Sequence, residues 1–406
     1  MSMPSALTLL RNRNFLLVWL TSVTDNITLA VVLLSQTWYV VDSLHMKAQL
    51  GWMMIAQSVP RLGLMVFGGV LADRLPKIKI MRATFWLRML AMACGALLFW
   101  SGTMTIWALI AVAATFGMLD AFFWPSRDAL MPSIVTADEL PRANTVMQAT
   151  NQIGLIAGPI IGGVLLSLLP FHAIYAVTAA MMLLGAQLIG SVRLPDAPPQ
   201  KHEHHMFAAL QEGVRYVIDS PVLRTLMSIY VVANLLFTGA VSVGIPIIAS
   251  ERLLAGAQGL SYLQSAYACG MISGFVTLML YPPKKKRLLL IVGLIVVEGI
   301  LIALQGGSRS LPLSAVLQLL LGFCVACNNV PMLSLLQQYA DRDKLGRVMS
   351  ISSVTTMGLS PVSYALVSAL LAGGAAVSMI MPVFGLTMSA VVALMALASK
   401  TVRSTN

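Results

Sequence analysis

The sequence predicts an all-α integral membrane protein with twelve transmembrane helices in two six-helix bundles and with both termini in the cytoplasm. Composition is the first observation behind this fold class: of 406 residues, 58% are hydrophobic and only 10% are charged, and the mean hydropathy is +0.84. Length is the second, because a spanning helix needs ~20 mostly apolar residues and about a dozen such helices fit this chain with short connections. The composition excludes a water-soluble enzyme.

Six apolar runs occupy the first half of the chain, and polar residues end each of them. Charged residues between Asp73 and Lys79 separate the second run from the third, and Gly102 lies between the third and the fourth. Pro170 and His172 divide one long apolar stretch into the fifth and sixth runs. In order, the predicted spans are 14–41, 50–72, 82–101, 104–125, 143–169 and 171–192.

Six further runs follow a polar break. Arg252 ends the seventh run, basic residues up to Arg287 precede the ninth, and Gly374 precedes the twelfth. In order, these spans are 223–250, 260–281, 288–306, 311–336, 346–371 and 376–398. The predicted domains are therefore two six-helix bundles at 1–192 and 223–406, joined by a linker at 193–222.

The two halves carry a faint internal repeat. Leu140 and Arg142, ahead of the fifth span, are echoed by Leu345 and Arg347 ahead of the eleventh. Duplicated halves of six spans are typical of secondary transporters, in which the halves rock about a central site.

The linker combines prolines, a histidine-rich run and a short amphipathic segment. Four apolar residues recur at helical spacing and predict a helix on the cytoplasmic membrane surface. They are Phe207, Leu210, Val214 and Val217. The run His202–His205 could bind a metal, but a second group of ligands is missing, so we interpret it as a solvated linker and predict no metal site.

The net charge of +11 is explained by the side of the membrane on which basic residues fall. With the N-terminus in the cytoplasm, most Lys and Arg collect on that side, and Lys47, Arg252 and Arg309 lie on the other. Basic loops are retained in the cytoplasm, so this imbalance places both termini there. Nucleic acid is not needed as a partner.

A charged loop follows the second predicted span and reads Gly69-Val-Leu-Ala-Asp73-Arg74-Leu-Pro-Lys77-Ile-Lys79. It resembles the G-x-L-a-D-R-x-x-R/K motif of the major facilitator superfamily, with Lys77 where an Arg is common. Gly69 lets two helices approach closely, and Asp73 can accept hydrogen bonds from the N-terminus of a facing helix. The resemblance implies that Gly69, Asp73, Arg74 and Lys77 form a cytoplasmic gate that latches the outward-open state.

The fifth predicted span carries a second pattern, Gly154-x-x-x-Gly158-Pro159-x-x-Gly162-Gly163. It is similar to the antiporter motif of the superfamily's proton-coupled exporters and matches at every Gly and at the Pro. Glycines four residues apart flatten one helix face, and a proline introduces a bend. The resemblance implies that this helix helps to seal the cytoplasmic side of a cavity. Together, this pattern and the gate motif favour export over import.

Three further segments indicate a branch of the superfamily: Asp120–Pro125, Leu140–Asn144 and Asp343–Ser350. Together with the linker helix they look like the macrolide-efflux and enterobactin-exporter branch, and the resemblance covers nearly the whole chain. One departure is that Gly117 and Asp120 stand in the fourth span, where drug exporters often carry an Arg followed by Gln-Gly that is tied to proton coupling. This departure leaves the coupling mechanism open.

Five charged residues lie at membrane depth, away from the ends of the predicted spans, where charges are costly and mark functional candidates. At about 1.5 Å per residue, Asp25 lies ~17 Å and Arg61 ~18 Å from the cytoplasmic ends of their helices, so the two could face each other. Asp25 is the first candidate for proton or substrate coupling, and a structural ion pair with Arg61 is the alternative. Arg88 and Asp120 are predicted nearer the cytoplasmic interface, as gate or packing groups.

Glu298 lies about 15 Å deep in the ninth predicted span and has no obvious partner of opposite charge in its half. It is a candidate for coupling or substrate binding, and a structural or lipid-facing role is the alternative. Polar and aromatic residues of the spans are candidates for a substrate cavity, although about half of the amides are expected to join helices instead. These cavity candidates are Asn26, Gln36, Gln148, Asn151, Gln152, Asn234, Phe237, Asn328, Asn329 and Tyr364.

The sequence thus predicts a secondary transporter of a bacterial inner membrane that exports amphipathic organic compounds, of drug or siderophore type, by proton-coupled alternating access. The expected partners are a small amphipathic molecule, protons and membrane lipids, and the protein is expected to be a monomer without a cofactor. A lysophospholipid or lipid translocator and a non-transporting membrane sensor on the same fold stay open as alternatives. An enzyme is not predicted, because no nucleophile or metal-ligand cluster shares a segment.

Overall fold

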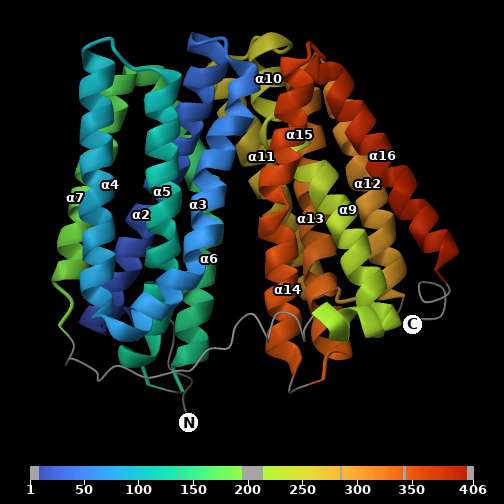
Figure 1. Ribbon diagram of the computed structural model, residues 1–406, viewed down its shortest axis with the longest axis horizontal. Helices are drawn as coiled ribbons and strands as arrows, with labels where there is room; N and C mark the ends of the chain where they lie inside the picture. The colour runs from blue at the N-terminus through green and yellow to red at the C-terminus, as the bar shows by residue number, and fades with distance from the viewer. Residues whose placement is uncertain (1–8, 137, 194–213, 284–285, 342–343, 400–406) are drawn as a thin grey trace. The chain divides into compact units, whose positions relative to one another are not determined.

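The structure is a computed structural model that describes residues 9–136, 138–193, 214–283, 286–341 and 344–399. Within these ranges the side chains at 66, 69, 70, 72–74, 155, 346, 347 and 350 are not described. The described residues form helices and contain no strand (Figure 1), so the predicted all-α class is confirmed. Some predicted features lie outside the described residues: His202–His205, Phe207, Leu210, Asp343 and the side chains of Gly69, Asp73 and Arg74.

The described residues up to Arg193 contain six long helices. They are α2 (Arg13–Trp38), α3 (Lys47–Arg74), α4 (Lys77–Trp100), α5 (Ile106–Leu130), α6 (Leu140–Leu168) and α7 (Phe171–Gly190). A π-helical turn, η1 (Tyr39–Ser43), continues α2, and a 3₁₀ turn, η2 (Met131–Ser133), continues α5. The predicted boundary between the fifth and sixth spans is confirmed, because α6 and α7 meet at Pro170.

From Pro221 onward the described residues form eight helices, because two predicted spans are each broken in two. The set is α9 (Pro221–Ser242), α10 (Gly244–Glu251), α11 (Gly256–Leu280), α12 (Arg287–Gly307), α13 (Leu311–Tyr339), α14 (Leu345–Gly358), α15 (Ser360–Ala372) and α16 (Val377–Ala398). The breaks precede Pro246 and Pro361, each in the first turn of the helix that follows. Proline has no N–H to donate back to the preceding turn, which explains both interruptions.

Eleven helical segments among the described residues are long and apolar enough to cross a membrane. α3 is not one of them, and part of its side chains is not described. The count of twelve spans and the side on which the termini lie therefore stay predictions.

Local hydrogen bonds explain where several helices begin. Oδ1 of Asn12 accepts hydrogen bonds from the backbone N–H groups of Asn14 at 3.1 Å and Phe15 at 3.3 Å, at the start of α2. Oγ1 of Thr105 accepts one from the N–H of Ala108 at 3.3 Å, at the start of α5. Such caps satisfy first-turn N–H groups that have no partner within the helix.

The chain divides into two compact units. The first unit contains α2, α4–α7 and the part of α3 from Ala56 onward. The second unit contains α9–α16 together with His45–Ile55, which includes the first turns of α3. The linker residues 194–213 lie outside the described part, so the domain boundaries stay a prediction.

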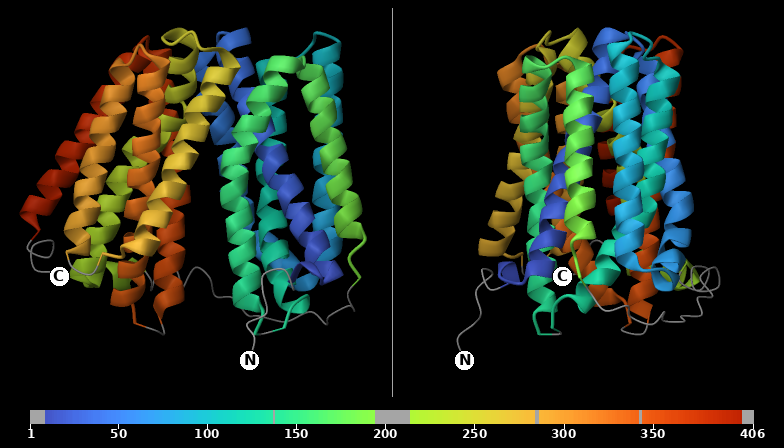
Figure 2. Two further views of the ribbon diagram at one scale, coloured as in Figure 1. Left: turned by 180° about the vertical axis from the view of Figure 1, so that it is seen from behind. Right: turned by 90° about the vertical axis from the view of Figure 1, so that its left-hand side faces the viewer.

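Each unit packs its third and last helices together through small residues. In the first unit, a Cβ at Gly95 of α4 would lie 2.6 Å from the ring of Tyr175 in α7. In the second unit, Gly299 of α12 and Gly385 of α16 approach each other so closely that a Cβ on either would overlap the backbone of the other helix. α4 is in contact with α7, and α12 is in contact with α16, a pair that the left-hand view of Figure 2 shows side by side. The same helix contact thus recurs in both units.

A second recurring contact positions the helix that carries Asp120. Gly117 of α5 meets the backbone carbonyl of Gln57 in α3, and Gly322 of α13 meets that of Tyr267 in α11. A Cβ would not fit at either glycine. Asp120 lies one turn beyond Gly117, so this close approach holds its carboxylate beside α3.

Candidate functional site

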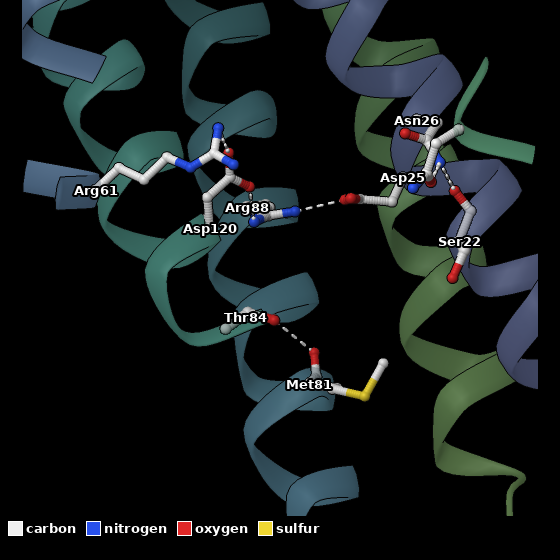
Figure 3. A network of polar contacts seen from close by, with 9 residues as sticks. Ser22, Asp25, Asn26, Arg61, Met81, Thr84, Arg88 and Asp120 are labelled. Atoms are coloured by element: carbon white, nitrogen blue, oxygen red, sulfur yellow. Dashed lines mark hydrogen bonds and ion pairs between the residues drawn. The ribbon is translucent and has the colours of Figure 1, made fainter. Parts of the chain in front are cut away.

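A guanidinium lies at the centre of a group of buried charges in the first unit. Arg88 of α4 is 1% exposed and donates hydrogen bonds to two carboxylates (Figure 3). Its Nη1 donates to Oδ1 of Asp25 in α2 and its Nη2 to Oδ1 of Asp120 in α5, each at 2.5 Å. Both carboxylates are also withdrawn from solvent, because their side chains are 1% exposed.

A second arginine approaches the group from α3. Nη1 of Arg61 lies 3.8 Å from Oδ2 of Asp120, and the Arg61 side chain is 33% exposed. We call Asp25, Arg61, Arg88 and Asp120 the charge cluster. Its two carboxylates balance its two guanidiniums, and α2, α3, α4 and α5 each contribute one residue.

Two phenylalanine rings lie close to Arg88 of the charge cluster. The guanidinium carbon of Arg88 lies 5.4 Å from the ring centroids of both Phe116 and Phe123. Withdrawing charges from water costs several kcal/mol per ion, so a buried ion pair adds little net stability, yet removing one partner leaves an unpaired charge and costs about 3–5 kcal/mol. The charge cluster is therefore sensitive to any event that neutralises one of its members, such as protonation of a carboxylate.

The structure corrects two predictions about these residues. Asp25 is paired with Arg88 and not with Arg61, whose ion-pair partner is Asp120. Arg88 and Asp120 do not lie near helix ends: Arg88 lies eleven residues after the start of α4 at Lys77, and Asp120 lies ten residues before the end of α5 at Leu130. α4 begins and α5 ends about five residues beyond the predicted spans, because the turns at these two ends carry charged residues that a search for apolar runs leaves out.

A chain of amides adjoins the charge cluster. Asn26 follows Asp25 on α2 and donates from Nδ2 to Oδ1 of Asn151 in α6 at 3.0 Å. Asn151 donates in turn to Oε1 of Gln148 at 3.0 Å. Asn26 and Asn151 are half-buried and Gln148 is exposed, so this polar strip reaches the surface of the unit. The structure thus brings together three of the predicted cavity residues.

The glycines of the predicted antiporter pattern pack α6 against α2. A Cβ at Gly154 would lie 2.8 Å from the Cβ of Asn26, closer than side chains tolerate. The three contacts are Gly154 with Asn26, Gly158 with Ala30 and Gly162 with Leu34. Pro159 and Gly163 are buried in the same helix. Because the contacts repeat every four residues on both helices, the pattern holds α6 at near-backbone distance from the helix that carries Asp25.

The second unit holds Glu298, and this residue does not face lipid. Glu298 of α12 is 3% exposed and accepts a hydrogen bond from Nδ2 of Asn328 in α13 at 3.3 Å. The predicted lipid-facing alternative is therefore wrong. Nearby in sequence, Asn329 accepts a hydrogen bond from the hydroxyl of Tyr230 in α9 at 2.8 Å.

The other predicted residues lie in varied surroundings. Gln36 is buried in α2 at 2% exposure, and Asn234 donates to the carbonyl of Tyr230 within its own helix. The half-buried candidates are Gln152, Phe237, Tyr364 and the first residue of α4, Lys77. Their parts in a cavity or gate stay predictions. Across the described residues, no three His, Cys, Asp or Glu side chains are grouped as a metal site requires.

The sequence did not predict that Arg88 lies at the centre of the charge cluster. The available signal was charge balance: away from the span ends, the first half carries two acids and two arginines, which predicts a joint neutral group. The predicted helix ends obscured it, because they put Arg88 and Asp120 at a different depth from Asp25.

Long apolar helices in two units, with paired charges buried at mid-helix, define a multi-pass membrane protein of the transporter type. The chain belongs to the Major Facilitator Superfamily, whose sequence model matches residues 15–364. Among solved structures, a POT family transporter in complex with 5-aminolevulinic acid matches with a TM-score of 0.75 at 13% identity, covering 96% of this chain and 97% of that chain. At this identity the match shows the fold alone.

Relatives of this chain carry the names of efflux and siderophore transporters. Macrolide efflux protein A of Streptococcus pyogenes is 24% identical over 358 residues, which cover 83% of this chain and 84% of the relative. Multidrug efflux pump Tap of Mycolicibacterium fortuitum is 32% identical over 152 residues, 35% of this chain and 37% of the relative. The Staphyloferrin A transporter of Staphylococcus aureus is 30% identical over 137 residues, 34% of each chain. The predicted resemblance to exporters of the superfamily is confirmed.

Proposed function

We propose that this chain is a proton-coupled exporter of amphipathic organic compounds in a bacterial inner membrane, and that it works by alternating access. The names of the relatives support export, as do the glycines that pack α6 against α2. The charge cluster is the observation that carries the proposal, because it holds two protonatable carboxylates inside the membrane-spanning helices.

Proton binding to the charge cluster can change the ion pairs that hold its helices together. Two unit charges 4 Å apart attract each other by about 4 kcal/mol at an effective dielectric constant of about 20. A proton on Asp25 removes this attraction to Arg88 and loosens the connection between α2 and α4. Asp120 remains paired with both Arg61 and Arg88. A ligand or proton that favours one arrangement of the helices shifts the population toward it.

The amide chain supplies a substrate contact on the same helix. Asn26 is the neighbour of Asp25, and it is bonded to Asn151 of α6. Amides donate and accept hydrogen bonds, which suits compounds rich in hydroxyl and carbonyl groups. If substrate binding at Asn26 and Asn151 alters the pairing of Asp25, linkage requires that protonation of Asp25 alters substrate affinity by the same factor.

The gate and the orientation belong to the same proposal. Gly69, Asp73, Arg74 and Lys77 close the cytoplasmic side, and both termini lie in the cytoplasm. The excess of basic residues in the loops predicted on that side supports this orientation.

Replacing Asp25 with asparagine tests the proposal. Inverted membrane vesicles that contain the wild-type protein should accumulate a radiolabelled macrolide when a proton gradient is imposed. The variant Asp25→Asn should lose this accumulation because its side chain cannot carry the proton. Exchange of labelled for unlabelled macrolide without a gradient should persist, since substrate binding does not require the proton.

The matched control is Asp138→Asn. Asp138 is exposed in the turn before α6 and takes part in none of the ion pairs of the described residues. This variant should accumulate macrolide as the wild type does. Full accumulation by Asp25→Asn would remove Asp25 from the coupling mechanism, and loss of exchange as well as accumulation would assign Asp25 a structural role instead.

A further inference from the structure

Glu298 is an acid buried in the second unit without a basic partner among the described residues. It lies near the middle of α12, eleven residues after Arg287, and is 3% exposed. Its hydrogen bond comes from the neutral amide of Asn328. The ion pairs of the described residues do not include it.

Arg88 in the first unit has the counter-charge that Glu298 lacks among the described residues. Arg88 lies eleven residues after the start of α4, the third long helix of its set, just as Glu298 lies eleven residues after the start of α12. Each contacts a polar residue on the next long helix, Asp120 on α5 and Asn328 on α13. Arg88 is neutralised by carboxylates of its own chain, but the described residues supply no such counter-charge to Glu298.

The surroundings of Glu298 also contain an acceptor without a donor. Oδ1 of Asn328 is buried and has no hydrogen-bond partner among the described residues. Nδ2 of the same side chain is already engaged with Glu298. A buried acceptor left without a donor costs free energy, so this oxygen and the carboxylate together favour a ligand that carries both positive charge and N–H groups.

The neighbouring titratable groups cannot provide that charge. Titratable side chains near Glu298 include the hydroxyls of Tyr230 in α9 and Tyr267 in α11 and the thiol of Cys324 in α13. The remaining neighbour of α12, α16, contains no titratable residue.

We propose that Glu298 and Asn328 bind the protonated amine of an amphipathic substrate. The inference rests on the proposed export function and names its substrate class. An unpaired carboxylate is unfavourable at this depth, so the empty site holds a proton on Glu298. The ammonium group enters, its N–H groups bond to the Glu298 carboxylate and to Oδ1 of Asn328, and the proton of Glu298 leaves. One positive charge replaces another, and the site stays neutral.

Equilibrium binding to the full chain in detergent tests the site with a matched pair of probes. Dansylcadaverine carries a primary ammonium, and its N-acetyl derivative has the same ring and chain without the charge. Wild-type protein should bind the amine at least about tenfold more tightly than the amide. In Glu298→Gln the affinity for the amine should fall by at least about tenfold, and that for the amide should change by less than about twofold.

Two further variants make the result decisive. Glu251→Gln removes an acid of the same unit that pairs with Lys47 at an exposed position, and it should keep the preference for the amine. Asn328→Leu keeps the acid and removes the unpartnered oxygen, so it should weaken binding of the amine alone, whether or not Glu298→Gln folds. An unchanged preference in Glu298→Gln, or an equal loss for both probes, would overturn the proposal.

This experiment is independent of the transport test on Asp25 because no gradient is applied. Failure here would leave proton-coupled export through the charge cluster intact. Failure of Asp25→Asn to affect accumulation would leave amine binding at Glu298 intact.

Discussion

At the scale of the residue, Arg88 determines how the charges of the first unit are arranged. Its planar guanidinium presents two nitrogens to two carboxylates on different helices. A lysine ammonium is a compact point charge and cannot present this forked geometry. Arg88 therefore joins α2 and α5 to α4 through a single side chain.

Replacing Arg88 with methionine should destabilise the protein strongly. Two buried carboxylates would lose their partner, and breaking a buried pair in this way costs about 3–5 kcal/mol. Thermal unfolding in detergent should show a clear decrease for Arg88→Met, whereas Arg309→Met, at an exposed position, should unfold as the wild type does. Adding Asp25→Asn and Asp120→Asn to Arg88→Met should restore much of the loss. If Arg88→Met were as stable as the wild type, the pairing would contribute nothing.

Individual functional candidates could be found from the sequence, but their partners could not. The cost of a charge inside the membrane identified Asp25, Arg88, Asp120 and Glu298. Which charges pair depends on how the helices cross and rotate. These angles cannot be derived from the order of the residues. Asp25 and Arg61 lie at similar predicted depths, yet Asp25 pairs with Arg88 of α4, which also pairs with Asp120 of the neighbouring α5.

At the scale of the element, the contact between α2 and α6 connects the charge cluster to the antiporter pattern. Asp25 and Asn26 lie on the same helix as Ala30, the residue that meets Gly158. A change in the spacing of these two helices would therefore reach both the amide chain and Asp25.

A methyl group at Gly158 should disturb this contact. In Gly158→Ala the added Cβ would overlap the Cβ of Ala30, and overpacking of this kind costs about 1–3 kcal/mol. Macrolide accumulation in vesicles should fall together with thermal stability.

Gly293→Ala is the control, because nothing lies within 4 Å of a Cβ at that exposed helical position. Alanine favours a helix over glycine by about 0.5–1 kcal/mol, so this variant should be as stable as the wild type or more so. Equal behaviour of the two variants would show that the α2–α6 contact is not tightly packed.

Helices were easier to predict than their ends. Apolar runs located each helical region, and Pro170 separated α6 from α7 as predicted. The runs missed the charged turns at Lys77 and near Leu130, because a helix continues into the polar surroundings once its hydrogen bonds are established. They also missed the breaks before Pro246 and Pro361, since a proline in an apolar run does not by itself distinguish a kink from an end.

At the scale of the whole molecule, composition and length predicted an all-helical membrane protein, and two motifs predicted the superfamily. Both predictions are confirmed by the helices and by the family match over residues 15–364. The fold does not determine the substrate or the coupling ion. Proteins of one fold carry different binding sites, and each site depends on a few side chains.

The central claim is that a substrate gradient and a proton gradient are exchanged through the charge cluster. The most direct measurement uses proteoliposomes loaded with macrolide, diluted into macrolide-free medium without an imposed pH difference, with a pH-sensitive dye inside. Outward movement of macrolide through the wild-type protein should drive protons inward and acidify the lumen. In Asp25→Asn, macrolide should leave without acidification, or not leave at all. Acidification by Asp25→Asn equal to that of the wild type, or none by the wild type while macrolide leaves, would contradict the account.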